Sequence, residues 1–356
     1  MAVTTMRAAR YHPVCQRRPS QTGTNISQET NNCTIDEIPI PSISENEMLV
    51  KIASASLCHS DLMLFEGSIP ATEPVVMGHE GVGYVEKLGA NVKGFKPGDG
   101  IGFLYIKGVC FECEGCMVHN LNCKLGTARL QGFQSDGFFA EYAAVDYRNA
   151  IILPENLPME TSAPYFCAGI TAFHGVDSCD LKTGQWMAIV GCGGLGQMGI
   201  RFAKAMGLNV VGLDINDEVL TAARENGADV IINSRDADFE KKVREATGGG
   251  ADAAVVFSAA QAAYDSATKI LRMGGILMVI GLPSKPLQFS SFDLMRKLFQ
   301  IRSESTGPPQ QMPRAMEFIS KHNIKPKVEL YKLDQIHEMM DLMKSGKSKS
   351  RMAVVF

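Results

Sequence analysis

The stretch WMAIVGCGGLGQMGIRFAKAMGLNVVGLD, residues 186–214, decides the fold of this chain. It begins with an apolar run of strand length, turns through closely spaced glycines, continues with the apolar periodicity of a helix and ends in a second apolar run. This order is typical of a βαβ unit, because two parallel strands need a crossover between them. Similar runs recur as far as ILMVIGLP, residues 276–283. We therefore predict an α/β fold with a doubly wound parallel sheet.

The glycines inside this stretch also predict a phosphate-binding turn, since they follow a strand and open a helix. The first glycine permits a tight turn, the second lets the backbone approach a pyrophosphate, and the third lets the helix pack on the strand. Amides and the positive dipole end at the helix N-terminus favour an anion there. The candidate cofactor-binding residues of the turn are Gly191, Gly193, Gly194, Leu195 and Gly196.

An acidic residue, Asp214, ends the next apolar run. It stands about 20 residues beyond the turn, where a carboxylate accepts hydrogen bonds from the adenosine ribose of a dinucleotide. The same charge would repel a 2′-phosphate by about 4 kcal/mol, for unit charges some 4 Å apart at an effective dielectric of about 20. NAD is therefore favoured over NADP. A helix N-cap is the alternative role for Asp214.

The overall composition is that of an ordinary globular protein. The chain has 356 residues, of which 45% are hydrophobic and 21% charged, and its net charge is −3. This length favours two domains. Without a long basic run, nucleic acid is not an expected partner. Neither a signal-peptide core nor a membrane-spanning apolar run is found in the sequence, so we expect a cytoplasmic protein without a membrane partner.

The pattern of the chain changes along its length. From about residue 34 to 150, short strand-like runs alternate with Gly and Pro punctuation, which predicts a compact β-rich domain. Residues 17–32 are polar and without periodicity, and are interpreted as a surface loop. The βαβ pattern runs from about residue 170 to 300, and the tail that follows ends in the strand-like RMAVVF.

Four cysteines crowd into one short segment and predict a metal site. Soft ligands in this number can close a tetrahedral zinc shell, which is a structural site. Four unrelated buried cysteines would not be spaced so evenly. A zinc-binding nucleic-acid module is disfavoured, because the intervening residues contain no Lys or Arg. The ligands are Cys110, Cys113, Cys116 and Cys123.

A second set of possible ligands is dispersed along the chain: Cys58 in LCHSD, His79 with Glu80 in MGHEGVG, and Cys167 in FCAGITAF. Two thiolates and one imidazole leave the fourth zinc position open, which a catalytic zinc requires. Any one of these residues alone is more often a buried core residue. Their combination is what favours a catalytic metal site.

Taken in order, the motifs CHSD, GHEG with GYV, KPGDG, the four-cysteine segment, CAGITA and the glycine turn resemble those of the zinc-containing alcohol dehydrogenases of the medium-chain dehydrogenase/reductase superfamily. The similarity is greatest to the yeast-like branch and covers residues 34–356. It implies a GroES-like catalytic domain over residues 1–165, completed by 301–356, and a Rossmann NAD-binding domain over 166–300. It also implies a homodimer or homotetramer.

The resemblance further implies what the site residues do. In the family, residues matching Cys58, His79 and Cys167 hold the catalytic zinc, and a glutamate matching Glu80 can approach the metal during ligand exchange. Asp61 would orient His79.

Three more residues gain roles by the same resemblance. Ser60 would contact the bound alcohol and begin its proton path, Thr171 would lie against the nicotinamide, and Arg351 would reach the cofactor pyrophosphate. The metal content would be one catalytic and one structural zinc. The substrate would be a small alcohol or carbonyl compound.

The sequence departs from the family pattern in two places. Cys116 and Cys123 enclose six residues, one fewer than usual, which implies a slightly distorted zinc shell. Met63 stands where many members have the histidine that passes the proton to solvent. A ribose hydroxyl and water would then take over from Ser60, or the enzyme would favour reduction of an activated substrate.

The candidates for the substrate pocket have core packing as their alternative role. They are Ser60, Phe65, Tyr105 and Leu282. Two other functions stay open from the sequence. One is a specialised zinc-containing reductase of a conjugated alkene, an imine or a biosynthetic carbonyl. The other is a non-enzymatic zinc-binding interaction protein, which the glycine turn disfavours.

Overall fold

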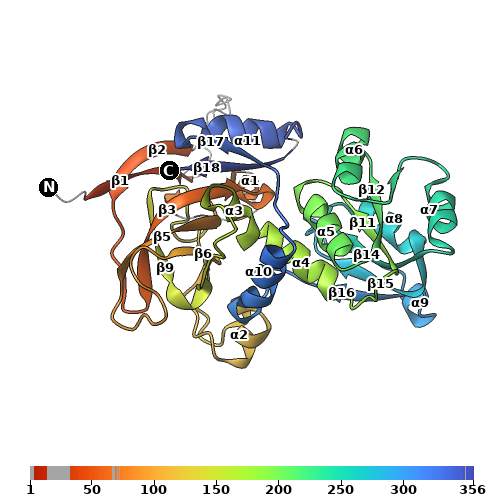
Figure 1. Ribbon diagram of the computed structural model, residues 1–356, viewed down its shortest axis with the longest axis horizontal. Helices are drawn as coiled ribbons and strands as arrows, with labels where there is room; N and C mark the ends of the chain where they lie inside the picture. The colour runs from red at the N-terminus through yellow and green to blue at the C-terminus, as the bar shows by residue number, and fades with distance from the viewer. Residues whose placement is uncertain (1–3, 14–32, 66–68, 70, 72, 349) are drawn as a thin grey trace, which may run out of the picture. The chain divides into compact units, whose positions relative to one another are not determined.

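The computed structural model describes residues 4–13, 33–65, 69, 71, 73–348 and 350–356 (Figure 1). The polar stretch at residues 17–32 lies outside these ranges. The chain divides into two compact units, one of Met1–Phe166 with Lys327–Phe356 and one of Cys167–Pro326. Among the helices of the described residues, none is both long and apolar enough to cross a membrane.

The first unit is built mainly of antiparallel sheet. Its largest sheet has the order β10-β6-β5-β3-β18-β17, with β9 also paired to β3. A smaller sheet has the order β2-β1-β4, and β7 pairs with β8. The strands are β1 (Thr5–Tyr11), β2 (Cys33–Pro39), β3 (Glu47–Leu57), β4 (Val75–Val76), β5 (Glu80–Leu88), β6 (Gly100–Phe103), β7 (Ile106–Lys107), β8 (Arg129–Leu130), β9 (Tyr142–Asp146), β10 (Ala150–Ile152), β17 (Val328–Tyr331) and β18 (Arg351–Val355).

The core of this unit lies where the apolar faces of these strands meet its helices. Met48, Val50 and Ile52 alternate on β3 and are fully buried, as β-sheet periodicity requires. Met339 and Met340 of a C-terminal helix pack into the same core. The helices of the unit are α1 (His59–Phe65), α2 (Glu114–Val118), α3 (Met159–Ser162) and α11 (Ile336–Lys344).

The C-terminal strand β18 is an interior strand of this sheet, between β3 and the edge strand β17. It pairs antiparallel with β3 and parallel with β17. In its register Ala353 stands opposite Ser56, and on the other side of β3, Ser56 stands opposite Glu80 of β5. The last residues of the chain thus reach the strand ends where Cys58 and His79 stand.

The second unit is a parallel sheet with the order β13-β12-β11-β14-β15-β16. This is the doubly wound order 3-2-1-4-5-6, so the prediction of a doubly wound parallel sheet is confirmed. The strands are β11 (Trp186–Val190), β12 (Asn209–Asp214), β13 (Val230–Asn233), β14 (Ala251–Val256), β15 (Leu271–Val279) and β16 (Phe299–Ser303). Its helices are α4 (Ala168–Asp177), α5 (Gly194–Ala205), α6 (Asp217–Glu225), α7 (Phe239–Thr247), α8 (Gln261–Ile270), α9 (Ser291–Met295) and α10 (Met312–Lys321).

The second unit extends past residue 300, where the change in sequence pattern had suggested its end. Strand β16 pairs with β15, so the sheet itself continues beyond that position. Helix α10 packs on α4, where the Arg314 guanidinium lies 2.7 Å from Asp177 and the rings of Phe318 and Phe173 are 5.4 Å apart. These contacts keep residues 301–326 with the parallel sheet.

Candidate functional site

Four possible metal ligands converge in what we name the Cys58 cluster: Cys58, His79, Glu80 and Cys167. Cys58 follows β3, and His79 and Glu80 stand at the start of β5. Cys167 is peptide-bonded to Phe166, a buried residue of the first unit. One ligand atom from each residue lies within 4.8 Å of the others. Only Cys167 is partly exposed, so the cluster is a largely buried group of two thiols, one imidazole and one carboxylate.

Asp61 holds two members of this cluster in place. Its carboxylate is fully buried. One oxygen lies 2.8 Å from Nδ1 of His79, and the other accepts a hydrogen bond of 2.8 Å from the backbone amide of Cys58. With Nδ1 engaged, Nε2 is the nitrogen left to bind a metal, as in other carboxylate–histidine–metal arrangements. The sequence-based expectation placed Asp61 beside His79, and the structure brings the two together.

Glu80 is held asymmetrically. Its Oε2 accepts hydrogen bonds from Ser56 Oγ and from an Arg351 terminal nitrogen. Its Oε1 is buried and has no hydrogen-bond partner among the described residues. Burial raises the pKa of Glu80 to about 7, the Cys58 thiol adds to the rise, and the Arg351 charge opposes it. An orphaned carboxylate oxygen beside two sulfurs and an imidazole fits the donor set of a zinc ion.

The four cysteines of the second candidate site also converge, and we name them the four-cysteine cluster. Their sulfurs all lie within 4.8 Å of one another. Cys110 Sγ is 3.9 Å from Cys116 Sγ and 3.7 Å from Cys123 Sγ. These distances exclude disulfides, and they match the edge of about 3.8 Å that a tetrahedron with Zn–S bonds of about 2.3 Å would have. The residues therefore fit a closed zinc shell.

Backbone amides point at two of these sulfurs. Lys124 N donates to Cys113 Sγ and Cys110 N donates to Cys123 Sγ, both at 3.4 Å. The Lys124 amide lowers the pKa of Cys113 to about 6. The Cys110 amide likewise lowers the pKa of Cys123. Hydrogen bonds of this kind favour the thiolate, which is the form that binds zinc.

The short spacing between Cys116 and Cys123 is accommodated by a tight fold of the chain. A side chain at Gly115 would place its Cβ 1.9 Å from the carbonyl oxygen of Asn122. The backbone on the two sides of the segment thus approaches as closely as glycine allows. Gly115 explains how six intervening residues still bring the fourth sulfur to the other three.

The glycine turn has the shape that a dinucleotide phosphate needs. Gly191 has a φ of +88°, which a residue with a side chain rarely adopts. A Cβ at Gly196 would lie 2.1 Å from the Gly191 carbonyl oxygen, whereas a Cβ at Gly193 would meet nothing within 4 Å. The turn therefore packs tightly on its protein side and leaves open space beside Gly193, at the N-terminus of α5.

Asp214 is tied to this turn. Its Oδ2 accepts a hydrogen bond of 2.8 Å from the Cys192 amide, and its Oδ1 accepts from the amides of Ile215 and Asn216. The N-cap of α6 is Asn216, whose side chain accepts from Glu218 and Val219 amides. The alternative role of Asp214 as helix N-cap is therefore wrong.

The residues predicted for the substrate pocket fall in different environments. Tyr105 lies against the imidazole of His79, with ring centroids 5.0 Å apart. Ser60 Oγ is 4.0 Å from Cys58 Sγ. Phe65 packs edge-on against Tyr11 beside the core of the first unit.

The other predicted residues lie elsewhere. Leu282 is 77% exposed on the second unit. Thr171 is almost buried on α4. The Arg351 guanidinium is hydrogen-bonded to Glu80, and its predicted contact with the cofactor pyrophosphate stays a prediction.

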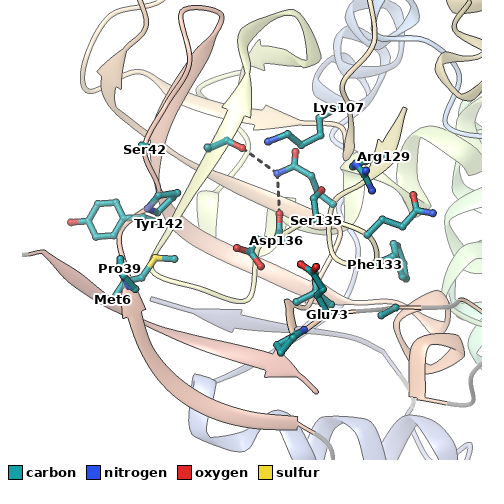
Figure 2. Close-up of a pocket in the computed structure, with 18 residues that line it drawn as sticks. Met6, Pro39, Ser42, Glu73, Lys107, Arg129, Phe133, Ser135, Asp136 and Tyr142 are labelled. Carbon is teal, nitrogen blue, oxygen red and sulfur yellow. Dashed lines mark hydrogen bonds between the residues drawn. The ribbon is translucent and has the colours of Figure 1, made fainter. Parts of the chain in front are cut away.

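The first unit also contains a large cavity that sequence reasoning did not foresee. It has a volume of about 780 Å³. Figure 2 shows charged side chains of both signs around it, including Lys107, Arg129 and Glu73. Phe133 forms part of its wall, and the Phe133 ring lies 5.0 Å from that of His79. None of the four predicted pocket residues lines this cavity. Phe133 is therefore a further aromatic neighbour of the Cys58 cluster, and no motif in the sequence marked it.

Comparison with known proteins places this architecture in a family. A family model described as an alcohol dehydrogenase GroES-like domain matches residues 44–155, and one described as a zinc-binding dehydrogenase matches residues 194–321. An alcohol dehydrogenase of Geobacillus stearothermophilus is 35% identical over 334 residues, covering 92% of this chain and 98% of that protein. This chain belongs to the zinc-containing alcohol dehydrogenase family.

Other alcohol dehydrogenases are similar to this chain to a comparable extent. The alcohol dehydrogenase of Rhizobium meliloti (strain 1021) is 32% identical over 322 residues, covering 90% of this chain and 94% of that protein. The alcohol dehydrogenase of Aeropyrum pernix is similar in structure, with a TM-score of 0.85, 27% identity and coverage of 98% of this chain and all of that one.

A more distant structure shares the fold. The acetophenone reductase of Geotrichum candidum, solved in complex with NAD, has a TM-score of 0.85 at 24% identity, covering this whole chain and 98% of that one. The zinc-containing alcohol dehydrogenase family thus accounts for both units, and the predicted GroES-like and Rossmann architecture is confirmed. The protein is an enzyme, an alcohol oxidoreductase of the zinc-binding type.

Proposed function

We propose that this alcohol dehydrogenase holds a catalytic zinc on Cys58, His79 and Cys167, and a structural zinc on the four-cysteine cluster. The observation that carries the proposal is the convergence of one buried and one partly exposed thiol, one imidazole and a carboxylate oxygen within 4.8 Å of one another. Three such ligands leave a coordination position for a substrate oxygen, whereas four thiolates leave none. The two clusters therefore support different roles for their metals.

We propose further that NAD binds the glycine turn. The open space beside Gly193 would admit the pyrophosphate, with Gly191, Gly194, Leu195 and Gly196 shaping the turn and the helix N-terminus. Asp214 would accept hydrogen bonds from the adenosine ribose and disfavour a 2′-phosphate. Thr171 and Arg351 would contact the nicotinamide and the pyrophosphate, as their match to the family motifs suggests.

The chemistry would be divided between the bound groups and the chain. Zinc acts as a Lewis acid on the alcohol or carbonyl oxygen, and NAD accepts or donates the hydride. Asp61 orients the ligating imidazole through its hydrogen bond to Nδ1. Ser60 presents its hydroxyl beside Cys58, where it would receive the proton of the alcohol. Tyr105 and Phe133 pack on His79 and would exclude water from that side.

These groups favour an alcohol and its aldehyde or ketone as the substrate class. Met63 stands on α1 and carries no titratable group, so a proton from Ser60 would pass to a ribose hydroxyl and water. The same position supports the second candidate, a reductase of a conjugated alkene, an imine or a biosynthetic carbonyl. Rates of NADH oxidation across aldehydes, ketones and enones separate the two, since faster turnover of enones than of any aldehyde or ketone would favour the second.

Metal analysis with a matched pair of variants tests the metal assignment. We expect two zinc ions per wild-type chain, and one in Cys167→Ala, which should lose turnover and still bind NADH as judged by fluorescence. Cys33→Ala is the control, because Cys33 is a buried cysteine of β2 that belongs to neither cluster. A wild-type chain with one zinc and no NADH binding would show that the protein is a zinc-binding interaction protein instead.

We also propose a branch of the family, an oligomeric state and a location for the protein. The motifs CHSD and GHEG with GYV support the yeast-like branch of the family. Among the described strands β16 pairs only with β15, so its open edge could join a second copy in a homodimer or homotetramer. We place the protein in the cytoplasm, without nucleic-acid or membrane partners. Light scattering of the purified protein tests the oligomer.

A further inference from the structure

We propose that Ser56 is a positioning residue for Glu80. Together with Arg351, it holds one carboxylate oxygen of Glu80 and thereby limits how often the other oxygen occupies the open position of a metal in the Cys58 cluster. The inference rests on the proposed function, because it assumes a metal in this cluster. It adds a residue that none of the sequence motifs marked.

Strand register places these residues together. Ser56 on β3 stands directly opposite Glu80 on β5, and its neighbour on the other side is Ala353 of β18. Directly opposed residues in a sheet point to the same face, and so do residues two apart on one strand. Arg351, two residues before Ala353, therefore faces the same side as Ser56 and Glu80. The hydrogen bonds of Ser56 Oγ and the Arg351 guanidinium to Glu80 Oε2 follow from this arrangement.

The two partners of Glu80 differ in what their removal would do. Arg351 supplies a positive charge beside a fully buried carboxylate, and loss of that charge would remove the arginine ion pair of Glu80. Ser56 is neutral and fully buried, so its hydroxyl can be removed while the charge balance stays intact. Ser56 is therefore the partner through which the hold on Glu80 can be loosened selectively.

A loosened Glu80 would compete with an external ligand for the open position of the metal. Oε1 of Glu80 is buried without a hydrogen-bond partner among the described residues, and a carboxylate oxygen of Glu80 lies within 4.8 Å of the other ligand atoms. With one of the two anchors on Oε2 gone, Glu80 would turn towards the metal more often. A small ligand that needs the open position would then bind more weakly.

The experiment compares Ser56→Ala with a matched control on the same strand. Ser54 is also fully buried, but its Oγ donates to the Met159 carbonyl oxygen at 2.6 Å instead of to Glu80. Ser54→Ala thus removes a buried hydroxyl without touching the carboxylate. Each protein is loaded with Co²⁺ in place of zinc, and the visible spectrum of the Co²⁺ is followed during titration with azide.

We expect Ser56→Ala to weaken azide binding measurably and by at most about ten-fold, since the loss of one hydrogen bond to a charged group sets the upper limit. Ser56→Thr, which keeps the hydroxyl, should restore the wild-type affinity, and Ser54→Ala should not change it. The difference should vanish in a Glu80→Gln background, because the competing carboxylate is then absent. If the alanine variant does not fold, Ser56→Val repeats the measurement, because valine has the shape of the threonine in Ser56→Thr but no hydroxyl.

Two results would overturn the inference: azide affinity of Ser56→Ala equal to that of Ser54→Ala, or a loss of affinity that persists in the Glu80→Gln background. If the proposed function itself is wrong, the experiment gives a different result. In that case metal analysis of the wild-type protein would find no metal bound by Cys58 and Cys167.

Discussion

Replacing Asp61 by asparagine should weaken zinc binding at the Cys58 cluster by about a hundred-fold without unfolding the protein. Asp61 accepts from the Cys58 amide on one oxygen and from His79 on the other, and both bonds are 2.8 Å long. Asparagine offers one oxygen and one NH₂ group, so one of the two donors would face another donor. A hydrogen bond to a buried charged group contributes about 1.5–3 kcal/mol, and its loss together with this mismatch places the effect at the upper end.

Chelator competition for zinc measures the effect, with the four-cysteine cluster as an internal reference that should keep its zinc. Asp252→Asn is the matched control. Asp252 is a buried carboxylate of the second unit that accepts from the Trp186 amide and from Gln185, so its loss should lower the melting temperature and leave both zinc affinities unchanged. If Asp61→Asn retained two zinc ions with wild-type affinity, the idea that Asp61 orients His79 for a metal would be refuted.

Three further predictions follow from the geometry. Gly115→Ala should lose the zinc of the four-cysteine cluster, because its Cβ would meet the Asn122 carbonyl oxygen at 1.9 Å; unchanged zinc content would contradict this. Gly193→Ala should leave the melting temperature within about 1 °C of wild type, because a Cβ at this position meets no atom within 4 Å. The added methyl group should weaken NADH binding about ten-fold, because it occupies the space of the phosphate. Equal NADH affinity of the variant and the wild type would count against a phosphate site beside Gly193. Burial lowers the pKa of His174, whose Nδ1 lies 3.1 Å from the Ser305 carbonyl. The unfolded chain therefore takes up a proton first as the pH falls below about 6.5, and stability should decline there by at most about 1.4 kcal/mol per pH unit. Melting curves of His174→Asn should lack this part of the decline.

The sequence predicted best those features that depend on residues close together in the chain. The strand, glycine turn and helix at residues 186–205 form one continuous segment, and the parallel sheet that they predicted is confirmed. The four cysteines lie within one short loop, so their convergence needed only that loop to close. Gly115 was not recognised as part of the closure, because its importance depends on where Asn122 folds back.

Contacts that depend on strand register could not be found in the same way. Ser56, Glu80 and Arg351 are distant in sequence, and their hydrogen bonds follow from the alignment of three neighbouring strands. The period-two pattern of β3 indicates which of its residues share a face, but it does not say which residue of another strand stands opposite. Phe133 was missed for a similar reason, because it lies in a loop without periodicity beside His79.

For the residues whose roles were assigned from family resemblance, the structure gives positions. The structure brings together Cys58, His79, Glu80 and Cys167, which individually resembled ordinary core residues. It does not assign their roles, and the proton path past Met63 stays a prediction. The sequence pattern also did not predict where the second unit ends. Helix α10 is held to α4 by side-chain contacts, and such contacts produce no periodicity in the sequence.

The placement of β18 has a consequence for how the protein is made. Arg351 and its partner Glu80 are 271 positions apart, so a ribosome must synthesise the whole second unit before this sheet can be completed. Until then one edge of β3 lacks its β18 partner, and edges of this kind are where nascent chains aggregate. The second unit is continuous in sequence and can fold while the first one waits. Slow, late closure of the first unit is therefore expected during biosynthesis, and the hydrogen bond from Arg351 that holds Glu80 can form only after β18 has emerged.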